Sequence, residues 1–190
     1  ATADDFAFHK RYMFPAEIKI SKKKSILVER DEGITPTTQE GLAKLRPVLP
    51  DGAHTFGAQT HPADGYVGIS VMTREKAKEF SKDPAMDIQV LSYGYHRTKK
   101  GYMAMAVVPA AQMALENAGL NVNEMKAIKT HNPFAANDVY LAKEMNIDAN
   151  GFNNYGSPLV FGHPQAPTAG RCIIEGIEEV AMAGGGYLLF

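Results

Sequence analysis

The stretch NNYGSPLVFGHPQAPTAGR, residues 153–171, decides the fold of this chain, because a short apolar run leads there into a histidine turn and then into a helix. Glycine, serine and proline at 156–158 interrupt regular structure, and the apolar residues 159–161 are few enough for a buried strand. Gly162 has no side chain and lets the chain approach a ligand closely, and the proline that follows the histidine stiffens the exit. The pattern predicts that His163 is presented on a tight turn at the functional site.

A helix is predicted to follow this turn. Apolar residues recur at helical spacing from Cys172 to Val180, and Thr168 is the expected N-cap. The helix would begin beside His163, with the positive end of its dipole facing the same space. Cys172 lies on the apolar stripe, so we expect it to be a buried packing residue and not a nucleophile.

A second motif, HNPFA at residues 131–135, lies between a predicted short buried strand at 127–130 and a predicted helix at 135–145. In α/β proteins the chemistry is placed where a strand ends and a helix starts, because backbone donors and the helix dipole converge there. Taken alone, a histidine before a helix is more often a cap or a core residue. The pairing of His131 with His163 favours a functional role for both.

Elsewhere, the sequence pattern predicts short strands and helices. Extended segments are expected at 17–20, 25–28, 66–72 and 88–95. Helices are expected at 41–45, behind a capping box of Thr37 and Glu40, at 74–80, capped by Thr73, and from Pro109 to about Gly119. Strands that alternate with helices imply a sheet covered by helices.

Composition bounds the class of protein. The 190 residues are 45% hydrophobic and 22% charged, which suits a soluble globular protein with one sizeable core. A net charge of -1 gives no general attraction to nucleic acid or to an anionic membrane. No apolar run reaches the roughly 18 residues that span a bilayer. The basic runs at 22–24 and 97–100 either face solvent or meet the phosphates of a nucleotide-bearing ligand.

The numbers and positions of cysteine and histidine indicate whether the chain could form disulfides or bind a metal. One cysteine excludes an internal disulfide framework and fits a reducing, cytoplasmic setting. His54 and His61 lie in one loop, but no Cys, Asp or Glu at ligand spacing completes a metal site. We therefore expect both to be ordinary loop histidines and expect no metal.

In their order along the chain, these motifs resemble the C-terminal half of a thiolase (acetyl-CoA acetyltransferase). The last third of that family reads Asn-x-x-Gly-Gly, a few apolar residues, Gly-His-Pro, and Gly-Arg at a helix start. This chain supplies Asn153, Gly156, 162–164 and 170–171. Many members carry Asn-Glu-Ala-Phe at the second motif, whereas this chain is similar to the members with His-Asn-x-Phe.

The resemblance implies the α/β class and the thiolase fold, layered α/β/α. It covers nearly all of this chain but only about the second half of a family member. Residues 1–60 would form a peripheral part of the loop domain. Residues 61–190 would form the C-terminal thiolase domain, truncated before the family's last Cys-x-Gly loop.

The resemblance also implies contacts to coenzyme A. With residues 64–65 on the family's Asp-Gly, Thr60 takes the place of the serine that contacts pantetheine, and it keeps the hydroxyl. Phe134 matches the phenylalanine that packs against pantetheine, and Gly162 completes the expected binding residues. His61 stands where the family has a glycine, a departure that bears on the shape of this loop.

The reaction implied by the resemblance is a reversible Claisen condensation and thiolytic cleavage of 3-ketoacyl-CoA through a covalent acyl-enzyme. His163 would act as base for a nucleophilic cysteine and, with His131, as a donor to the thioester oxyanion. A second cysteine would move the proton at the α carbon. Neither reactive cysteine lies in this chain, and no permanent cofactor is implied, since the coenzyme A thioester is the substrate.

Two hypotheses of different class follow. Either the chain is part of an active acyl-CoA thiolase whose remainder supplies both cysteines, or it is an inert thiolase-fold subunit that binds acyl-CoA or a partner chain. Two histidines at one cleft favour the first hypothesis, since a purely structural subunit has no physical need of them. The resemblance further implies a homo-oligomer and, for some members with the histidine motif, a small zinc-binding OB-fold companion.

Overall fold

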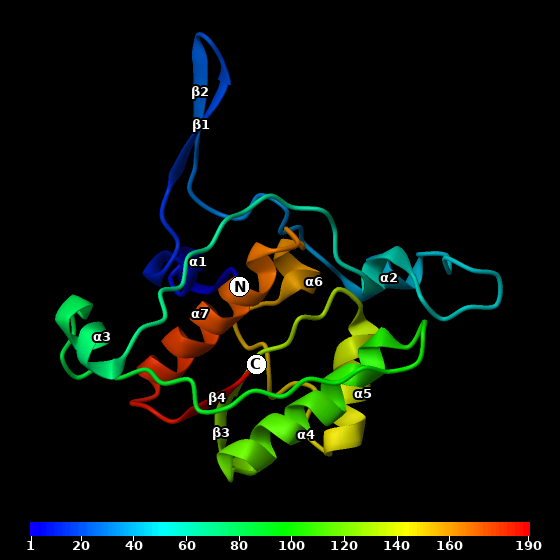
Figure 1. Cartoon of the computed structure of the whole chain (residues 1–190). Helices are drawn as coiled ribbons and strands as arrows, with labels where there is room; N and C mark the ends of the chain where they lie inside the picture. The colour runs from blue at the N-terminus through cyan, green and yellow to red at the C-terminus, as the bar shows by residue number, and fades with distance from the viewer.

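The structure is a computed structural model that describes residues 1–190 (Figure 1). Its α-helices are α1 Ala3–Phe6, α2 Gln39–Ala43, α3 Arg74–Phe80, α4 Val107–Ala118, α5 Ala135–Met145, α6 Pro158–Phe161 and α7 Pro167–Met182. Its strands are β1 Ala16–Ser21, β2 Lys24–Val28, β3 Met125–Ile128 and β4 Tyr187–Leu189. Short 3-10 turns are η1 His9–Arg11, η2 Phe56–Ala58, η3 Met103–Ala106 and η4 Val122–Glu124. None of the helices has both the length and the apolar composition that a membrane span requires.

The body of the molecule is built on the parallel strands β3 and β4, with Ala127 opposite Leu188. Helix α7 packs on both strands. It comes so close that a Cβ on Gly176 would lie 2.3 Å from the Leu188 side chain. Ile128 of β3 packs on a second group of residues from α4, α5 and the loop after α5, which forms the core: Val108, Leu141, Ala142 and Phe152. Strands covered by helices give the α/β arrangement that the sequence predicts.

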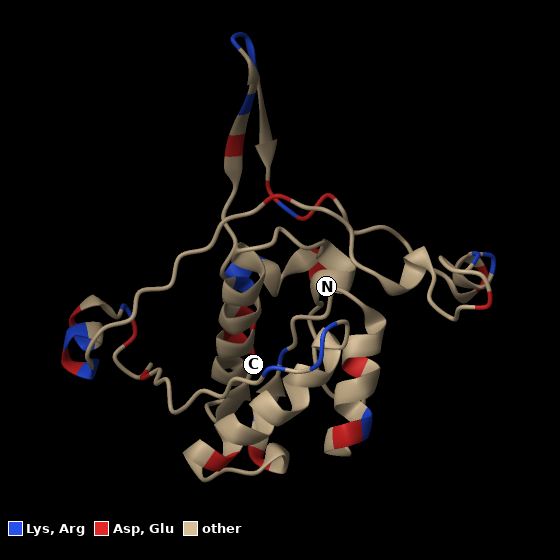
Figure 2. Cartoon of the chain, turned by 45° about the vertical axis from the view of Figure 1, so that its right-hand side comes forward, with Lys and Arg blue, Asp and Glu red and all other residues tan.

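An antiparallel ribbon of β1 and β2 projects from this body (Figure 1). Ile18 pairs with Ile26 and Glu17 with Leu27. The ribbon confirms the extended segments predicted at 17–20 and 25–28. The basic run at 22–24 lies at its exposed tip (Figure 2).

Helices α3, α4 and α5 confirm the sequence predictions closely. Helix α5 has the predicted bounds, and α3 begins after Thr73, whose hydroxyl accepts a hydrogen bond from the N–H of Lys76 at 3.4 Å. Helix α4 begins at Val107 and not at the predicted Pro109, and it ends as predicted before Gly119, its C-cap. Gly119 has a φ of 67°, a left-handed conformation that glycine adopts without strain.

The strands predicted at 66–72 and 88–95 are wrong. Both segments run without regular strand pairing, and their large side chains face solvent: Val71 is 79% exposed, Val90 79% and Tyr93 75%. Alternating apolar residues favour extended backbone, but a strand also needs a neighbour that accepts and donates its hydrogen bonds. The second segment instead packs on α4, where a Cβ on Gly94 would lie 2.0 Å from the carbonyl oxygen of Ala110.

The cap of α2 differs from the prediction by one residue. Thr38, and not Thr37, accepts a hydrogen bond from the N–H of Gly41, at 3.0 Å. Two successive threonines offer two hydroxyls, and the extended backbone of Thr38 places its own within reach of the helix start.

Candidate active site

The Gly-His-Pro turn is carried by one turn of helix, so the strand predicted at 159–161 is wrong. Helix α6 begins at Pro158, a residue that suits the first helical position because it has no N–H to leave unpaired. The N–H of Phe161 donates to the Ser157 carbonyl at 3.1 Å, and that of Gly162 donates to the Pro158 carbonyl at 3.0 Å. A short apolar run does not distinguish strand from helix by itself, and here the proline at its start favours the helix.

His163 is held by its main chain and by its ring. Its N–H donates to the carbonyl of His61 at 2.9 Å, and its Nδ1 lies 2.7 Å from the Thr168 hydroxyl. Thr168 is fully buried and is the second residue of α7, so it is not the predicted N-cap, a position that Ala166 holds. With Nδ1 bound to Thr168, Nε2 is the ring atom left to take or give a proton.

The second histidine meets the first, as the paired motifs predict. His131 lies just after β3, and its ring is edge-on to that of His163, with the centroids 4.6 Å apart and the planes at 84°. The pKa of His131 is lowered, first because the ring is partly desolvated and second because a charge on His163 repels its proton. At neutral pH His131 is therefore uncharged and donates one N–H.

A buried polar cluster fixes the loop of His131. Asp138 in α5 accepts hydrogen bonds from the Thr130 hydroxyl at 2.7 Å, from the Asn153 amide at 3.3 Å and from the Asn132 amide. Burial raises the pKa of Asp138, and these three bonds oppose the rise. The cluster joins both motifs, since Asn153 opens the stretch that leads to the other histidine. Sequence reasoning missed Asp138, whose one signal was its place in the first turn of a helix that follows a motif.

Residues 59–62 join the two histidine loops directly. The N–H of Thr60 donates to the carbonyl of Pro133 at 2.8 Å, and Pro62 forms a parallel bridge with His163. An isolated antiparallel bridge between Gln59 and Phe134 adds to the link. The segment therefore sets how far apart the two loops stand.

The predicted pantetheine contacts lie on these same loops. The Thr60 hydroxyl donates to the carbonyl of Pro158 at 2.6 Å, so its hydrogen is engaged within the protein and its lone pairs are left for a donor on a ligand. Phe134 is 43% exposed, and its ring lies 5.4 Å from that of His54. Both residues are thus within the region of the histidine pair, one through a bond to α6 and the other at the start of α5.

Gly162 adopts a φ of 93°, which favours glycine. A Cβ there would lie 2.7 Å from the Cβ of Ala63 and 3.0 Å from Nε2 of His61. Residues of the chain itself therefore fill the space that a side chain at 162 would take. The close approach that requires a glycine is an approach of residues 61–63.

Cys172 is confirmed as a packing residue. It is 1% exposed, and its Sγ lies 3.7 Å from the carbonyl oxygen of Thr130. Burial, with a smaller effect of Glu175, raises the pKa of its thiol to about 12, so the thiolate is scarcely populated. The structure gathers no group of three or more His, Cys, Asp or Glu that could hold a metal ion, and His54 instead contacts the Gln59 side chain at 3.3 Å.

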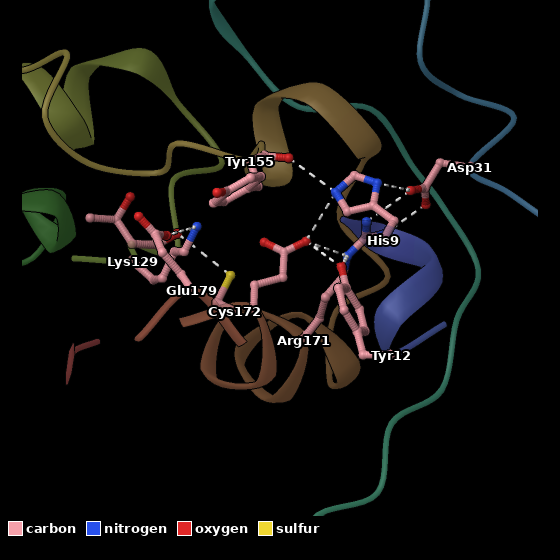
Figure 3. Close-up of polar contacts among 10 residues, drawn as sticks. His9, Tyr12, Asp31, Lys129, Tyr155, Arg171, Cys172 and Glu179 are labelled. Carbon is pink, nitrogen blue, oxygen red and sulfur yellow. Dashed lines mark hydrogen bonds and ion pairs between the residues drawn. The ribbon is translucent and has the colours of Figure 1, made fainter. Parts of the chain in front are cut away.

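Helix α7 also carries a buried network of charged groups (Figure 3). Arg171 makes a two-pronged contact with Asp31, at 2.7 Å and 2.8 Å, and its guanidinium lies 3.4 Å above the centre of the Phe161 ring. Glu175 is fully buried and accepts hydrogen bonds from Arg171 at 3.2 Å and from the Tyr12 hydroxyl. Burial raises the pKa of Glu175, and the charge of Arg171 opposes the rise. The network fastens the N-terminal residues to the helix that holds Thr168.

Comparison with known proteins identifies the family. The family described as "Thiolase, C-terminal domain" matches residues 85–189. Peroxisomal 3-ketoacyl-CoA thiolase B of Mus musculus is 32% identical over 164 residues, which cover 85% of this chain and 38% of that protein. Mitochondrial 3-ketoacyl-CoA thiolase of Bos taurus is 27% identical over 187 residues, which cover 98% of this chain and 47% of that protein. The chain thus spans less than half the length of these relatives.

Solved structures agree with the sequence comparison. Human mitochondrial 3-ketoacyl-CoA thiolase superposes with a TM-score of 0.83 at 26% identity, over 98% of this chain and 47% of that chain. The same human enzyme in complex with CoA superposes with a TM-score of 0.80 at 25% identity, over 98% and 46%. Motifs, fold and relatives agree that this chain belongs to the thiolase family and contains its C-terminal domain.

Proposed function

We propose that this chain supplies the histidine side of the active site of an acyl-CoA thiolase, an acetyl-CoA C-acyltransferase that forms and thiolytically cleaves 3-ketoacyl-CoA. The observation that carries the proposal is the contact between His131 and His163, whose ring centroids are 4.6 Å apart although the residues come from separate loops. The names of the relatives, 3-ketoacyl-CoA thiolases, support the same substrate class.

His163 is suited to be the base of the reaction. Thr168 holds its Nδ1 at 2.7 Å, so Nε2 is free to take the proton of a cysteine thiol in either direction of the reaction. In the condensation direction it returns this proton to the departing thiolate of coenzyme A, and in thiolytic cleavage it takes the proton of the incoming coenzyme A thiol. The cysteine belongs to the part of the protein outside this chain, because the thiol of Cys172 is buried and its pKa is raised.

His131 is suited to be an oxyanion donor. Its lowered pKa keeps the ring neutral at pH 7, and a neutral imidazole offers one N–H to the thioester oxygen without carrying a charge of its own. His163 provides the second donor when it is protonated. Two donors fixed on braced loops stabilise the developing negative charge with little rearrangement.

Coenzyme A is the proposed ligand, as a substrate and not as a resident cofactor. A human relative is described in complex with CoA, which supports binding by this domain. In this chain we assign Phe134 to pack against pantetheine, Thr60 to accept a hydrogen bond from it, and Gly162 to the wall beside it.

A homo-oligomer and a small zinc-binding OB-fold companion are proposals from the family resemblance alone. A cytoplasmic location is likewise a proposal from cysteine usage, and the relatives named above are peroxisomal and mitochondrial proteins.

Replacement of His163 by alanine in the complete protein that carries this chain tests the function. We expect thiolytic cleavage of 3-ketoacyl-CoA, followed as loss of the 3-ketoacyl thioester, to slow by about a thousandfold, because the base and one oxyanion donor are removed together. Cys172→Ser is the matched control on the same helix and should turn over near the normal rate. A His163→Ala protein that turns over normally would exclude the role assigned to this histidine.

A further inference from the structure

His61 occupies an unusual position beside the catalytic turn. Its carbonyl accepts the N–H of His163 at 2.9 Å, so its main chain is one of the fixed points of that residue. Its ring is half-buried, and its Nε2 is buried without a hydrogen-bond partner. A buried imidazole nitrogen with no partner costs free energy, so the ring stays there only because the surrounding chain confines it.

Two glycines confine this ring. A Cβ on Gly162 would lie 3.0 Å from Nε2 of His61, and a Cβ on Gly33 would lie 2.2 Å from the same atom. At Gly33, His61 supplies the three nearest atoms to such a Cβ. The imidazole therefore fills the gap between the loop of Gly33 and the turn that carries His163.

The loop of Gly33 is itself anchored. Asp31, two residues earlier, is held by both terminal nitrogens of Arg171 at 2.7 Å and 2.8 Å. Arg171 is on α7, one turn after Thr168, the residue that binds the His163 ring. His163 is therefore linked to Asp31 by two routes. One route runs through Thr168 and Arg171 of α7, and the other runs through His61 and the loop of Gly33.

We propose that His61 is a positioning residue for His163, pressed against Gly162 by the anchored loop of Gly33. The proposal rests on the proposed function for its effect on catalysis, but the contact that it describes does not. The family pattern has glycine where this chain has His61, so a side chain contacts the turn here.

Gly33→Ala tests the contact of His61 with the His163 turn without changing either residue. Its backbone is outside the left-handed region, so alanine is not strained there, but the new methyl group must displace the His61 ring. In the complete protein we expect kcat to fall by about tenfold to a hundredfold, since misplacement of a catalytic group by about 1 Å has effects of that order. KM for the CoA thioester should change little. Gly68→Ala is the matched control, because a Cβ there meets nothing within 4 Å.

The double variant His61→Gly/Gly33→Ala separates positioning from general damage. With the imidazole removed, the alanine methyl has room, so the double variant should have the kcat of His61→Gly alone. Independent losses that multiply would overturn the proposal. If Gly33→Ala does not fold, the double variant still decides, because restored folding supports the contact and continued failure to fold contradicts it.

A readout that needs no turnover distinguishes this proposal from the proposed function. Diethyl pyrocarbonate modifies accessible imidazoles, and peptide mass spectrometry follows the modification of His163 alone. We expect its rate to change severalfold in Gly33→Ala and to return in the double variant to the rate of His61→Gly. If the natural protein lacks thiolase activity but shows this pattern, the function fails and the positioning role stands. If the protein is active but Gly33→Ala does not change the rate at which His163 is modified, the positioning role is excluded.

Discussion

Thr168 shows how one hydroxyl can fix the ring of His163, the proposed base. It is fully buried at the start of α7 and lies 2.7 Å from Nδ1 of His163. A hydroxyl that accepts from Nδ1–H fixes the tautomer in which Nε2 is the basic atom. Without that acceptor, Nδ1 loses its partner and the ring is free to turn or to change tautomer.

Thr168→Val removes the acceptor and keeps the shape. We expect kcat for thiolytic cleavage to fall by about tenfold to a hundredfold, by analogy with the loss of a hydrogen-bond partner from a metal-binding histidine. Thr168→Ser keeps the hydroxyl and should retain most of the activity. The comparison is made on kcat and on the pH dependence of kcat. Equal losses in the two variants would mean that Thr168 acts through packing and not through its hydroxyl.

At the residue scale, sequence predicted the two histidines but not the groups that hold them. His163 was visible because glycine and proline surround it, and His131 because it lies between a strand and a helix. Thr168 was assigned as a cap, since a threonine at a helix start satisfies that rule as well. The His61 ring packs against Gly33, a residue distant in sequence, and no local pattern predicts such a contact.

Among the elements, α7 is the one that connects the site to the rest of the chain. Its first turn holds Thr168, its next turn holds Arg171, and Glu175 follows one turn later on the same side. The helix therefore holds the ring of His163, the proposed base, and binds the N-terminal segment with the residues of its next turns.

Arg171→Ala should destabilise the protein strongly. It leaves Asp31 and the fully buried Glu175 without their cation, and the loss of one partner from a buried ion pair costs about 3 to 5 kcal/mol. Arg11→Ala is the matched control, because Arg11 pairs with Glu178 at the surface, where an ion pair contributes at most about 1 kcal/mol. Urea unfolding of the complete protein measures both free energies of unfolding. Similar losses would show that burial does not set the strength of the Arg171 pair.

At the element scale, sequence predicts most helices and the β1–β2 ribbon, but it predicts strands at 66–72, 88–95 and 159–161 that the structure does not have. Helix α5 has the predicted bounds because a helix forms its hydrogen bonds within itself, so local sequence carries most of the signal. A strand depends on a neighbour elsewhere in the chain. The segments at 66–72 and 88–95 have strand-like sequences, yet no regular pairing forms, and their apolar side chains remain exposed.

Across the whole molecule, the N-terminal residues and α7 share one buried polar network, in which His9 is 2% exposed (Figure 3). His9 Nε2 donates to the Tyr155 carbonyl at 3.0 Å, and its Nδ1 is buried without a partner. The pKa of His9 is lowered, chiefly by burial and then by the charge of Arg171, although Asp31 and the bond to Tyr155 oppose the shift.

This lowered pKa predicts a loss of stability in mild acid. In the unfolded chain His9 takes a proton near its ordinary pKa of 6.5, whereas the folded protein takes it only at lower pH. Between these two pH values the unfolded state binds more protons, so the free energy of unfolding falls as the pH drops below about 6.5. The slope reaches at most about 1.4 kcal/mol per pH unit for one histidine. His131 acts in the same direction.

His9→Gln isolates this contribution, because glutamine keeps a donor for Tyr155 but does not titrate. Urea unfolding of the complete protein between pH 5.5 and 7.5 should show a shallower dependence in the variant than in the natural protein. Glu175 and Asp138, whose pKa values are raised by burial, act in the opposite sense, but both are present in each protein and largely cancel in the difference. Parallel curves for the two proteins would mean that His9 has the same proton affinity in the folded and unfolded states, and the buried network would then not resist its protonation.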